Sequence, residues 1–194
     1  MKRLYSYLVV GLVVAELLLV LLSWLLSATM TEGVRSMLSG EGVRWFFGSF
    51  VLILASPWLV WMLLLSISLG SLWHCGILSS FRSRSYRQRV ALRTAFVVVT
   101  LILIVVVALT AVPHAVLLSA TGHLFPSAFS RALVPIISFC ICIVSVVYGL
   151  MSGRFEKMSD AINSLSYGIS QCAPLFVLYV VATQFIASLR FVFF

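Results

Sequence analysis

The sequence predicts an all-α fold, a polytopic transmembrane helix bundle with about five spans and one interfacial or re-entrant segment. Of its 194 residues, 62% are apolar and only 9% are charged. A soluble domain exposes most of its surface to water and does not need so much apolar sequence, whereas a surface that faces lipid does. Apolar runs of about 20 residues, long enough to cross the bilayer as helices, alternate with short polar loops. We therefore expect one transmembrane domain over residues 1–194 and no separate soluble catalytic domain.

The first predicted span covers residues 4–30 and follows Lys2 and Arg3. A signal peptide also begins with basic residues, but its apolar part is only about 7–15 residues long. Residues 27–29 also make a poor cleavage site. We therefore expect an uncleaved membrane-spanning helix.

The next apolar stretch covers residues 45–81. As one helix it would be about 55 Å long, against a hydrocarbon core of about 30 Å, yet it is too short for two spans and a turn. Ser56 and Pro57 offer a break, because proline disfavours helix in the residue before it. We expect an interfacial or re-entrant segment at 45–56 and the second span at 57–80.

Three further spans are predicted at 94–112, 132–151 and 166–189. Pro135 is expected in the first turn of its helix, where proline is tolerated. Pro174 lies deeper and leaves two interpretations open. It either breaks the helix and exposes backbone carbonyls to an ion, as in some transporters, or it is accommodated without function.

Basic residues predict the orientation of the chain, whose net charge is +8. The segment before the third span has five arginines and no acid: Arg82, Arg84, Arg87, Arg89 and Arg93. So many cations in a short loop resist translocation, so this loop is expected to be cytoplasmic and to attract anionic lipid. With the N-terminus inside, nine lysines and arginines lie on the inner side and four on the outer side. We expect a multi-pass membrane protein with its N-terminus inside and its C-terminus outside, and with no nucleic-acid partner.

Three polar residues within the spans are candidates for binding a substrate or an ion. Glu16 is the acidic residue nearest the middle of a span, where a charge costs about 2.5–3.5 kcal/mol. It should face protein or be protonated, and it is either a proton or cation site or a neutral carboxyl bonded to a neighbouring helix. Gln171 and Gln184 are the other candidates. A buried amide needs hydrogen-bond partners, from a ligand or from another helix.

The sequence contains no recognisable catalytic or metal-binding pattern. No nucleophile–base pair and no phosphate-binding loop occurs. The cysteines form no CxxC motif and no Cys/His cluster with zinc spacing: Cys75, Cys140, Cys142 and Cys172. We expect no enzyme activity, no metal and no cofactor, and cysteines that act as small apolar packing residues.

Short motifs follow one another in a specific order along the chain. They include Ala91-Leu92-Arg93-x-Ala95, Val134-Pro135-Ile136-Ile137, Val147-Tyr148-Gly149, Ala182-x-Gln184-Phe185-Ile186-Ala187 and, in the first half, Leu38-Ser39-x-Glu41-Gly42-x-Arg44-Trp45. Together they resemble the AbgT family, the bacterial p-aminobenzoyl-glutamate transporters. The resemblance implies a secondary transporter scaffold in the bacterial cytoplasmic (inner) membrane, a tendency to form dimers, and sodium or proton coupling.

The sequence also departs from the family pattern. The resemblance implies that a block with the substrate and sodium motifs would fall between Phe81 and Tyr86, where this chain has an Arg/Ser-rich seam. We therefore expect a shortened member without the central core, not competent for transport alone. The alternative is a non-transporting scaffold or accessory subunit that packs against a partner membrane protein. Small residues four apart, Ser66 with Gly70 and Ser145 with Gly149, suit helix contacts.

Overall fold

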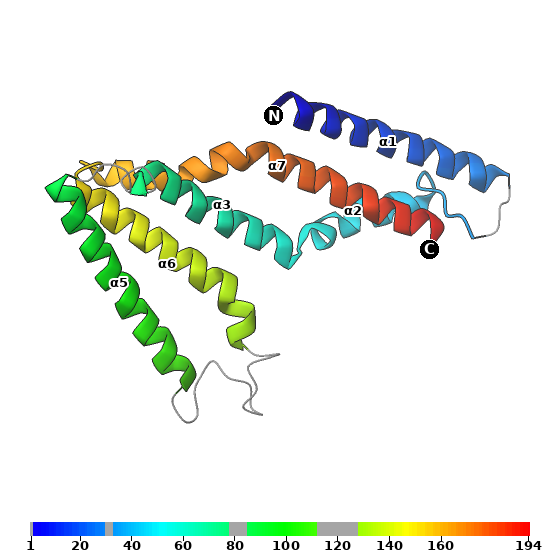
Figure 1. Ribbon diagram of the computed structural model, residues 1–194. Helices are drawn as coiled ribbons and strands as arrows, with labels where there is room; N and C mark the ends of the chain where they lie inside the picture. Colours follow the sequence, from blue (N-terminus) through cyan, green and yellow to red (C-terminus); the bar gives the residue numbers. More distant parts are fainter. Residues whose placement is uncertain (1, 30–32, 78–84, 112–127) are drawn as a thin grey trace. The chain divides into compact units, whose positions relative to one another are not determined.

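The computed structural model describes residues 2–29, 33–77, 85–111 and 128–194, and all regular structure among them is helical (Figure 1). The helices are α1 (Lys2–Ala28), α2 (Gly40–Leu54), α3 (Pro57–Cys75), α5 (Tyr86–Ala111), α6 (Ala128–Ser152) and α7 (Met158–Phe193). Among the described residues, five helices, all except α2, are long and apolar enough to cross a membrane. The predicted all-α, multi-pass membrane fold is therefore confirmed.

Helix α2 is the short helix that precedes the second span. Its 15 residues would extend only about 22 Å, less than the hydrocarbon core. Its start is well defined, because the Ser39 hydroxyl accepts a hydrogen bond from the Gly42 N–H at 3.1 Å. Helix α2 ends at Leu54 and α3 begins at Pro57, so the chain changes helix at the Ser-Pro pair. The interfacial placement of this segment stays a prediction.

Helix α7 is longer than the apolar run that suggested it. It begins at Met158, well before residue 166, and has 36 residues. The Asp160 carboxylate accepts hydrogen bonds from the backbone N–H groups of Glu156 and Lys157, both at 3.1 Å, and so organises this helix start. Because a helix satisfies its own backbone hydrogen bonds, it can continue through polar sequence beyond the hydrocarbon.

The two helical prolines lie inside continuous helices. Pro135 is within α6, which begins at Ala128, so it is not in the first turn as expected. Pro174 is within α7 and does not end it. The expectation for Pro135 assumed that the helix starts at residue 132, where the apolar run starts, but residues 128–131 extend it by one turn. The part of the loop between the third and fourth predicted spans that holds His114 and His123 falls outside the described residues.

The chain forms two compact units, which are described separately: Met1–Val60 with Cys172–Phe194 (unit 1), and Trp61–Gln171 (unit 2). The buried apolar core of unit 1 consists of Leu19, Met37, Phe191 and Val192. Two hydrogen bonds fasten the segment before α2 to this core. The Met37 N–H donates to the Ser23 hydroxyl, and the Arg35 N–H donates to the Val192 carbonyl, both at 3.1 Å.

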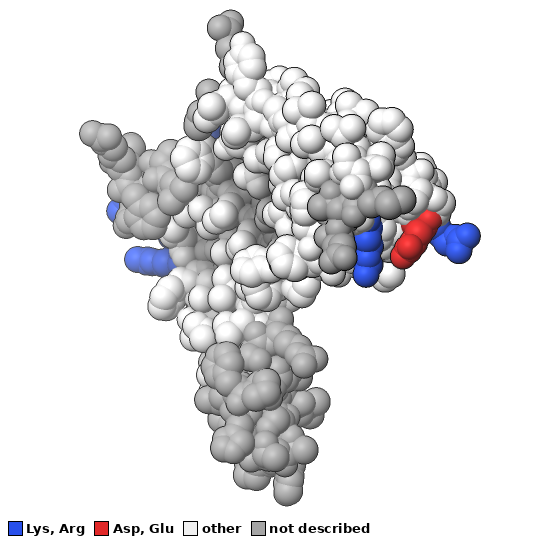
Figure 2. All heavy atoms as spheres, turned by 90° about the vertical axis from the view of Figure 1, so that its right-hand side faces the viewer, with Lys and Arg blue, Asp and Glu red and all other residues white. Residues whose placement is uncertain are grey.

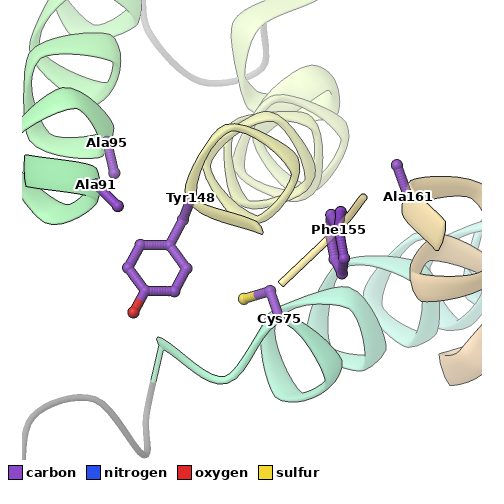
Figure 3. Packing of buried hydrophobic residues seen from close by; sticks show 6 residues of the cluster. All are labelled: Cys75, Ala91, Ala95, Tyr148, Phe155 and Ala161. Atoms are coloured by element: carbon purple, nitrogen blue, oxygen red, sulfur yellow. The ribbon is translucent and has the colours of Figure 1, made fainter. Parts of the chain in front are cut away.

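Unit 2 contains α5 and α6 side by side (Figure 1). Its buried cluster consists of Cys75, Ala91, Ala95, Tyr148, Phe155 and Ala161 (Figure 3). The Tyr148 ring lies between the two alanines of α5 and Cys75 at the end of α3. Gly149 leaves room for Phe155, since a Cβ on this glycine would lie 2.1 Å from the phenyl ring. Small residues of α5 and α6 thus make room for the Tyr148 ring of α6 and for the Phe155 ring of the loop that follows α6.

Helices α3 and α7 cross within unit 2 at a pair of glycines. A Cβ on Gly70 would lie 2.1 Å from the Cα of Gly168, and a Cβ on Gly168 would lie 1.7 Å from the Ser66 carbonyl oxygen. Nearby, the Ser164 hydroxyl donates to the Ser71 carbonyl at 3.4 Å. In lipid no hydrophobic force drives helices together, so close backbone approach and polar contacts supply the attraction. Ser66 and Gly70 thus make a helix contact inside the chain.

Substitution of Gly168 tests this crossing. We expect Gly168→Val to destabilise the protein by about 1–3 kcal/mol or more, because the new side chain collides with the α3 backbone. The matched control is Gly11→Val in α1, where a Cβ meets nothing within 4 Å. Unfolding followed by circular dichroism during titration with SDS would compare the two. Equal loss of stability in both variants would contradict the close crossing.

Candidate functional site

Charged side chains are sparse on the described surface. In the view of Figure 2 nearly all of the described surface is uncharged, and basic or acidic side chains appear only in a few places. Large apolar side chains are widely exposed along α1 and α5, among them Leu17, Leu21, Val97 and Ile104. Soluble monomers rarely expose contiguous apolar patches of more than a few hundred Å². These helices therefore contact the lipid bilayer, and polar groups inside the spans stand out against this background.

Glu16 on α1 is bonded to α7 within unit 1. The Ser188 hydroxyl donates to Glu16 Oε1 at 2.5 Å, and Ser188 is fully buried. The other carboxyl oxygen, Oε2, is buried and has no hydrogen-bond partner among the described residues. The hydrogen bond to Ser188 agrees with the interpretation of Glu16 as a carboxyl that bonds a neighbouring helix. Only one of its two oxygens takes part, so the other is available to an ion or a water molecule.

Gln184 lies one turn before Ser188 on the same face of α7. Its side chain is only 6% exposed, and neither Oε1 nor Nε2 has a partner in the described part of the chain. A buried amide without partners costs about 1–3 kcal/mol, so such a group normally signals a bound water, an ion or a ligand.

Glu16 and Gln184 line the same pocket, which has a volume of about 210 Å³. Its other walls come from α1, α2 and α7 and are apolar: Val13, Leu17, Phe50, Val180 and Val181. A water molecule occupies about 30 Å³ in the liquid, so the pocket has room for a few waters or a small, partly hydrated cation. The unpaired oxygens of Glu16 and Gln184 are hard ligands of the kind that alkali and alkaline-earth cations prefer.

The other predicted residues are not part of this pocket. Gln171 is exposed on α7 and does not line it. Arg82 and Arg84 lie outside the described residues. Ser188, the partner of Glu16, is not among the residues predicted from the sequence. Its position four residues after Gln184 was a signal, but a serine in a span is too common to single out.

Two basic residues of unit 2 bond to helix ends. The Arg87 Nε donates to the Met151 carbonyl near the end of α6 at 3.4 Å, and the Arg154 guanidinium donates to the Cys75 carbonyl at the end of α3 at 3.5 Å. The last carbonyls of a helix are unpaired and carry partial negative charge, so a cation stabilises them. Arg89 and Arg93 are exposed on α5 and make no such contact among the described residues.

No group of three or more potential metal ligands comes together in the described ranges. The four cysteines are free thiols, and Cys75 is buried. The His74 ring packs beside Tyr167, with centroids 5.1 Å apart, rather than beside other ligands.

Substitutions at the Glu16 contact separate its structural role from a binding role. We expect Glu16→Gln to fold, because a glutamine oxygen still accepts the Ser188 hydrogen bond. Ser188→Ala removes the donor and should cost about 1–3 kcal/mol of stability. The same SDS titration measures both. Failure of Glu16→Gln to insert or assemble would show that the carboxyl is indispensable for the fold, contrary to this expectation.

Comparison with known protein families identifies the chain. A model of the AbgT putative transporter family matches residues 77–192, which include α5, α6 and all but the last residue of α7. Gln184 and Ser188 fall inside the match, whereas Glu16 and the motif around Trp45 fall outside it. No curated protein and no solved structure matches. Because the match covers more than half of its residues, the chain belongs to the AbgT transporter family.

Proposed function

We propose that this chain is the membrane scaffold of an AbgT-type secondary transport system and does not move p-aminobenzoyl-glutamate on its own. The family and the apolar helices make it a membrane protein of transporter type. The further step, that its substrate site needs another chain, is supported by the chemistry of its cavities.

The observation that carries the proposal is the mismatch between the described cavities and the substrate. p-Aminobenzoyl-glutamate has two carboxylates, which need arginine, lysine or several N–H donors. The pocket of unit 1 has about 210 Å³, below the usual range of about 300–1,000 Å³ for ligand sites, and it presents a carboxyl group. Two cavities of unit 2, of about 550 and 390 Å³, are large enough, but their walls are almost entirely apolar.

In this proposal the Glu16–Gln184 pocket holds the coupling ion, either sodium or a proton. Its size suits a small ion, and the free oxygens of both side chains face the same space. The substrate groups come from a second copy of the chain or from a partner membrane protein.

The arrangement of unit 2 supports an N-terminus-inside orientation in the bacterial cytoplasmic membrane. The bond between Arg87 and the Met151 carbonyl brings the start of α5 beside the end of α6. The basic start of α5 and the loop with Arg154 and Lys157 therefore lie at one end of the helix pair. The basic residues of both segments therefore lie on the same side of the membrane, as the predicted N-terminus-inside orientation requires.

Transport assays test the first part of the proposal. We expect the purified chain in proteoliposomes to show no uptake of labelled p-aminobenzoyl-glutamate driven by a sodium or proton gradient. Reconstitution with a membrane protein that supplies the substrate groups, sought first among the products of neighbouring genes, should give uptake, and Glu16→Gln should then abolish its dependence on the ion gradient. Gradient-driven uptake by the chain alone would contradict the proposal. Uptake by the pair that is unaffected by Glu16→Gln would favour the alternative, an accessory scaffold.

Cysteine labelling tests the orientation. In a background without native cysteines, Tyr86→Cys should resist a membrane-impermeant maleimide in intact cells and react after permeabilisation. Phe194→Cys at the exposed C-terminus serves as the matched position and should react in intact cells. The opposite pattern would reverse the proposed orientation.

A further inference from the structure

Glu16 lies at the centre of the span that α1 forms. The candidate span covers Leu4–Ala28, so twelve residues lie on either side of Glu16. At about 1.5 Å per residue, each half is about 18 Å long, which exceeds half of the hydrocarbon core of about 30 Å. The carboxyl group is therefore close to the bilayer centre in either orientation of the chain. Ionisable residues at that depth are rare and mark ion or proton pathways.

The pocket beside Glu16 offers few oxygen atoms to a metal cation. Apart from Gln184, its other lining residues have hydrocarbon side chains. At these residues α1, α2 and α7 are regular helix, so their backbone carbonyls bond within the helix. Pro174 deprives the Ser170 carbonyl of its helical donor, but Ser170 comes ten residues before Val180, the first α7 residue of the pocket. The pocket thus presents two unpaired oxygens, Glu16 Oε2 and Gln184 Oε1.

Two oxygens are too few to replace the hydration shell of a sodium ion. Hard cations such as calcium and magnesium take about six to eight oxygen ligands in proteins, and sodium is a hard cation of the same kind. A cation in a pore exchanges its hydration water for protein oxygens. Here water molecules would have to complete the shell, and the apolar walls offer these waters no hydrogen-bond partner. A proton, in contrast, needs a single oxygen.

Gln184 suits both protonation states of Glu16. A carboxylate only accepts hydrogen bonds, whereas a protonated carboxyl also donates one through its O–H. An amide accepts through Oε1 and donates through Nε2, so a reversed amide changes from donor to acceptor. Because Glu16 Oε1 already accepts from Ser188, the unpaired Oε2 is the oxygen left for the proton. The pocket has room for a water molecule that bridges Oε2 and the amide.

Glu16 is the titratable group of this pocket. None of the other described residues that line it is titratable or charged. Along α2 and α7 the charged residues nearest to the pocket in sequence are Arg44 and Arg190, and both are exposed and outside its lining. The Tyr179 hydroxyl, next to the pocket on α7, is bonded to Ser56. The charge of the pocket therefore follows the protonation of Glu16.

We propose that Glu16 and Gln184 form a proton-binding site, in which the amide reverses as the carboxyl gains or loses a proton, and that the pocket does not bind sodium. A hydronium ion in the pocket gives its proton to Glu16 Oε2 and leaves a water molecule, and the carboxylate becomes a neutral carboxyl. The reverse step returns the proton to water. This inference rests on the proposed function, because it names the ion that the pocket holds.

Infrared spectroscopy of the purified chain tests the protonation of Glu16. Difference spectra between acidic and alkaline pH should contain the C=O band of a protonated carboxyl that is lost in Glu16→Gln. The matched control Glu41→Gln removes an exposed carboxyl of α2 and should keep this band. Identical difference spectra of wild type and Glu16→Gln would overturn the proposal.

Replacement of Gln184 tests the role of the amide. Gln184→Met, or Gln184→Leu where the first variant does not fold, should shift the Glu16 C=O band to higher frequency, because the carboxyl loses a hydrogen-bond partner. Gln171→Met replaces an exposed amide of the same helix and should leave the band in place. An unshifted band in a folded Gln184 variant would overturn the proposal.

A sodium titration separates this inference from the transport proposal. Calorimetric titration of the purified chain with sodium chloride, against choline chloride at equal ionic strength, should show no saturable heat that is specific to sodium. Saturable sodium binding that is lost in Glu16→Gln would overturn the proton site and leave the scaffold role intact. Gradient-driven uptake by the chain alone would contradict the scaffold role, whereas the infrared measurements need no transport. The two failures are therefore distinguishable.

Discussion

The absence of water from the bilayer core is the constraint on which the rest of this structure depends. A backbone N–H or C=O without a partner costs several kcal/mol in hydrocarbon, so the spans are helices and the breaks between them need special partners. The change of helix at Ser56 and Pro57 is an example. The Ala55 N–H donates to the Val51 carbonyl at 2.9 Å and the Ser56 N–H donates to the Leu54 carbonyl at 2.7 Å, so both backbone donors are satisfied there. The side-chain hydroxyls of Ser56 and Tyr179 of α7 also bond to each other, within unit 1. At two further helix ends, Arg87 and Arg154 donate hydrogen bonds to carbonyls of α6 and α3.

The same constraint explains why small polar residues form much of the buried interior. In the described part of the chain, nine buried residues are polar or charged, and all of them except Gln184 are serines. Several serine hydroxyls return a hydrogen bond to a carbonyl of the preceding turn, as Ser71 does to Ser68 at 2.9 Å. Such serines act as small packing residues, much as glycine does at the Gly70–Gly168 crossing. Apolar bulk faces lipid instead, which inverts the usual arrangement of a soluble protein.

Sequence patterns predicted the features that follow from local composition, such as the spans. They missed the features that arise only when one helix contacts another. The spans follow from apolar runs, and Glu16 stood out because a carboxyl in a span is rare. The early start of α7 was missed, since Asp160 supports a helix in sequence that reads as a polar loop. Ser188 was missed because its role exists only once α7 meets α1. Gly168 was missed for the same reason, as its need for a bare Cα arises from the Ser66 carbonyl of another helix.

The pocket lined by Glu16 and Gln184 lies only partly within the residues that match the transporter family. Gln184 and Ser188 lie within residues 77–192, so the amide and hydroxyl side of the pocket belongs to the part shared with the transporter family. Glu16 lies outside that match, and its contribution must be argued from its own contacts. Those contacts leave one carboxyl oxygen and both amide atoms unpaired around one small space. If Glu16 and Gln184 served only to hold the helices together, we would expect their polar atoms to bond to each other. That these atoms have no partner among the described residues is therefore an argument for a bound ion or water in the pocket.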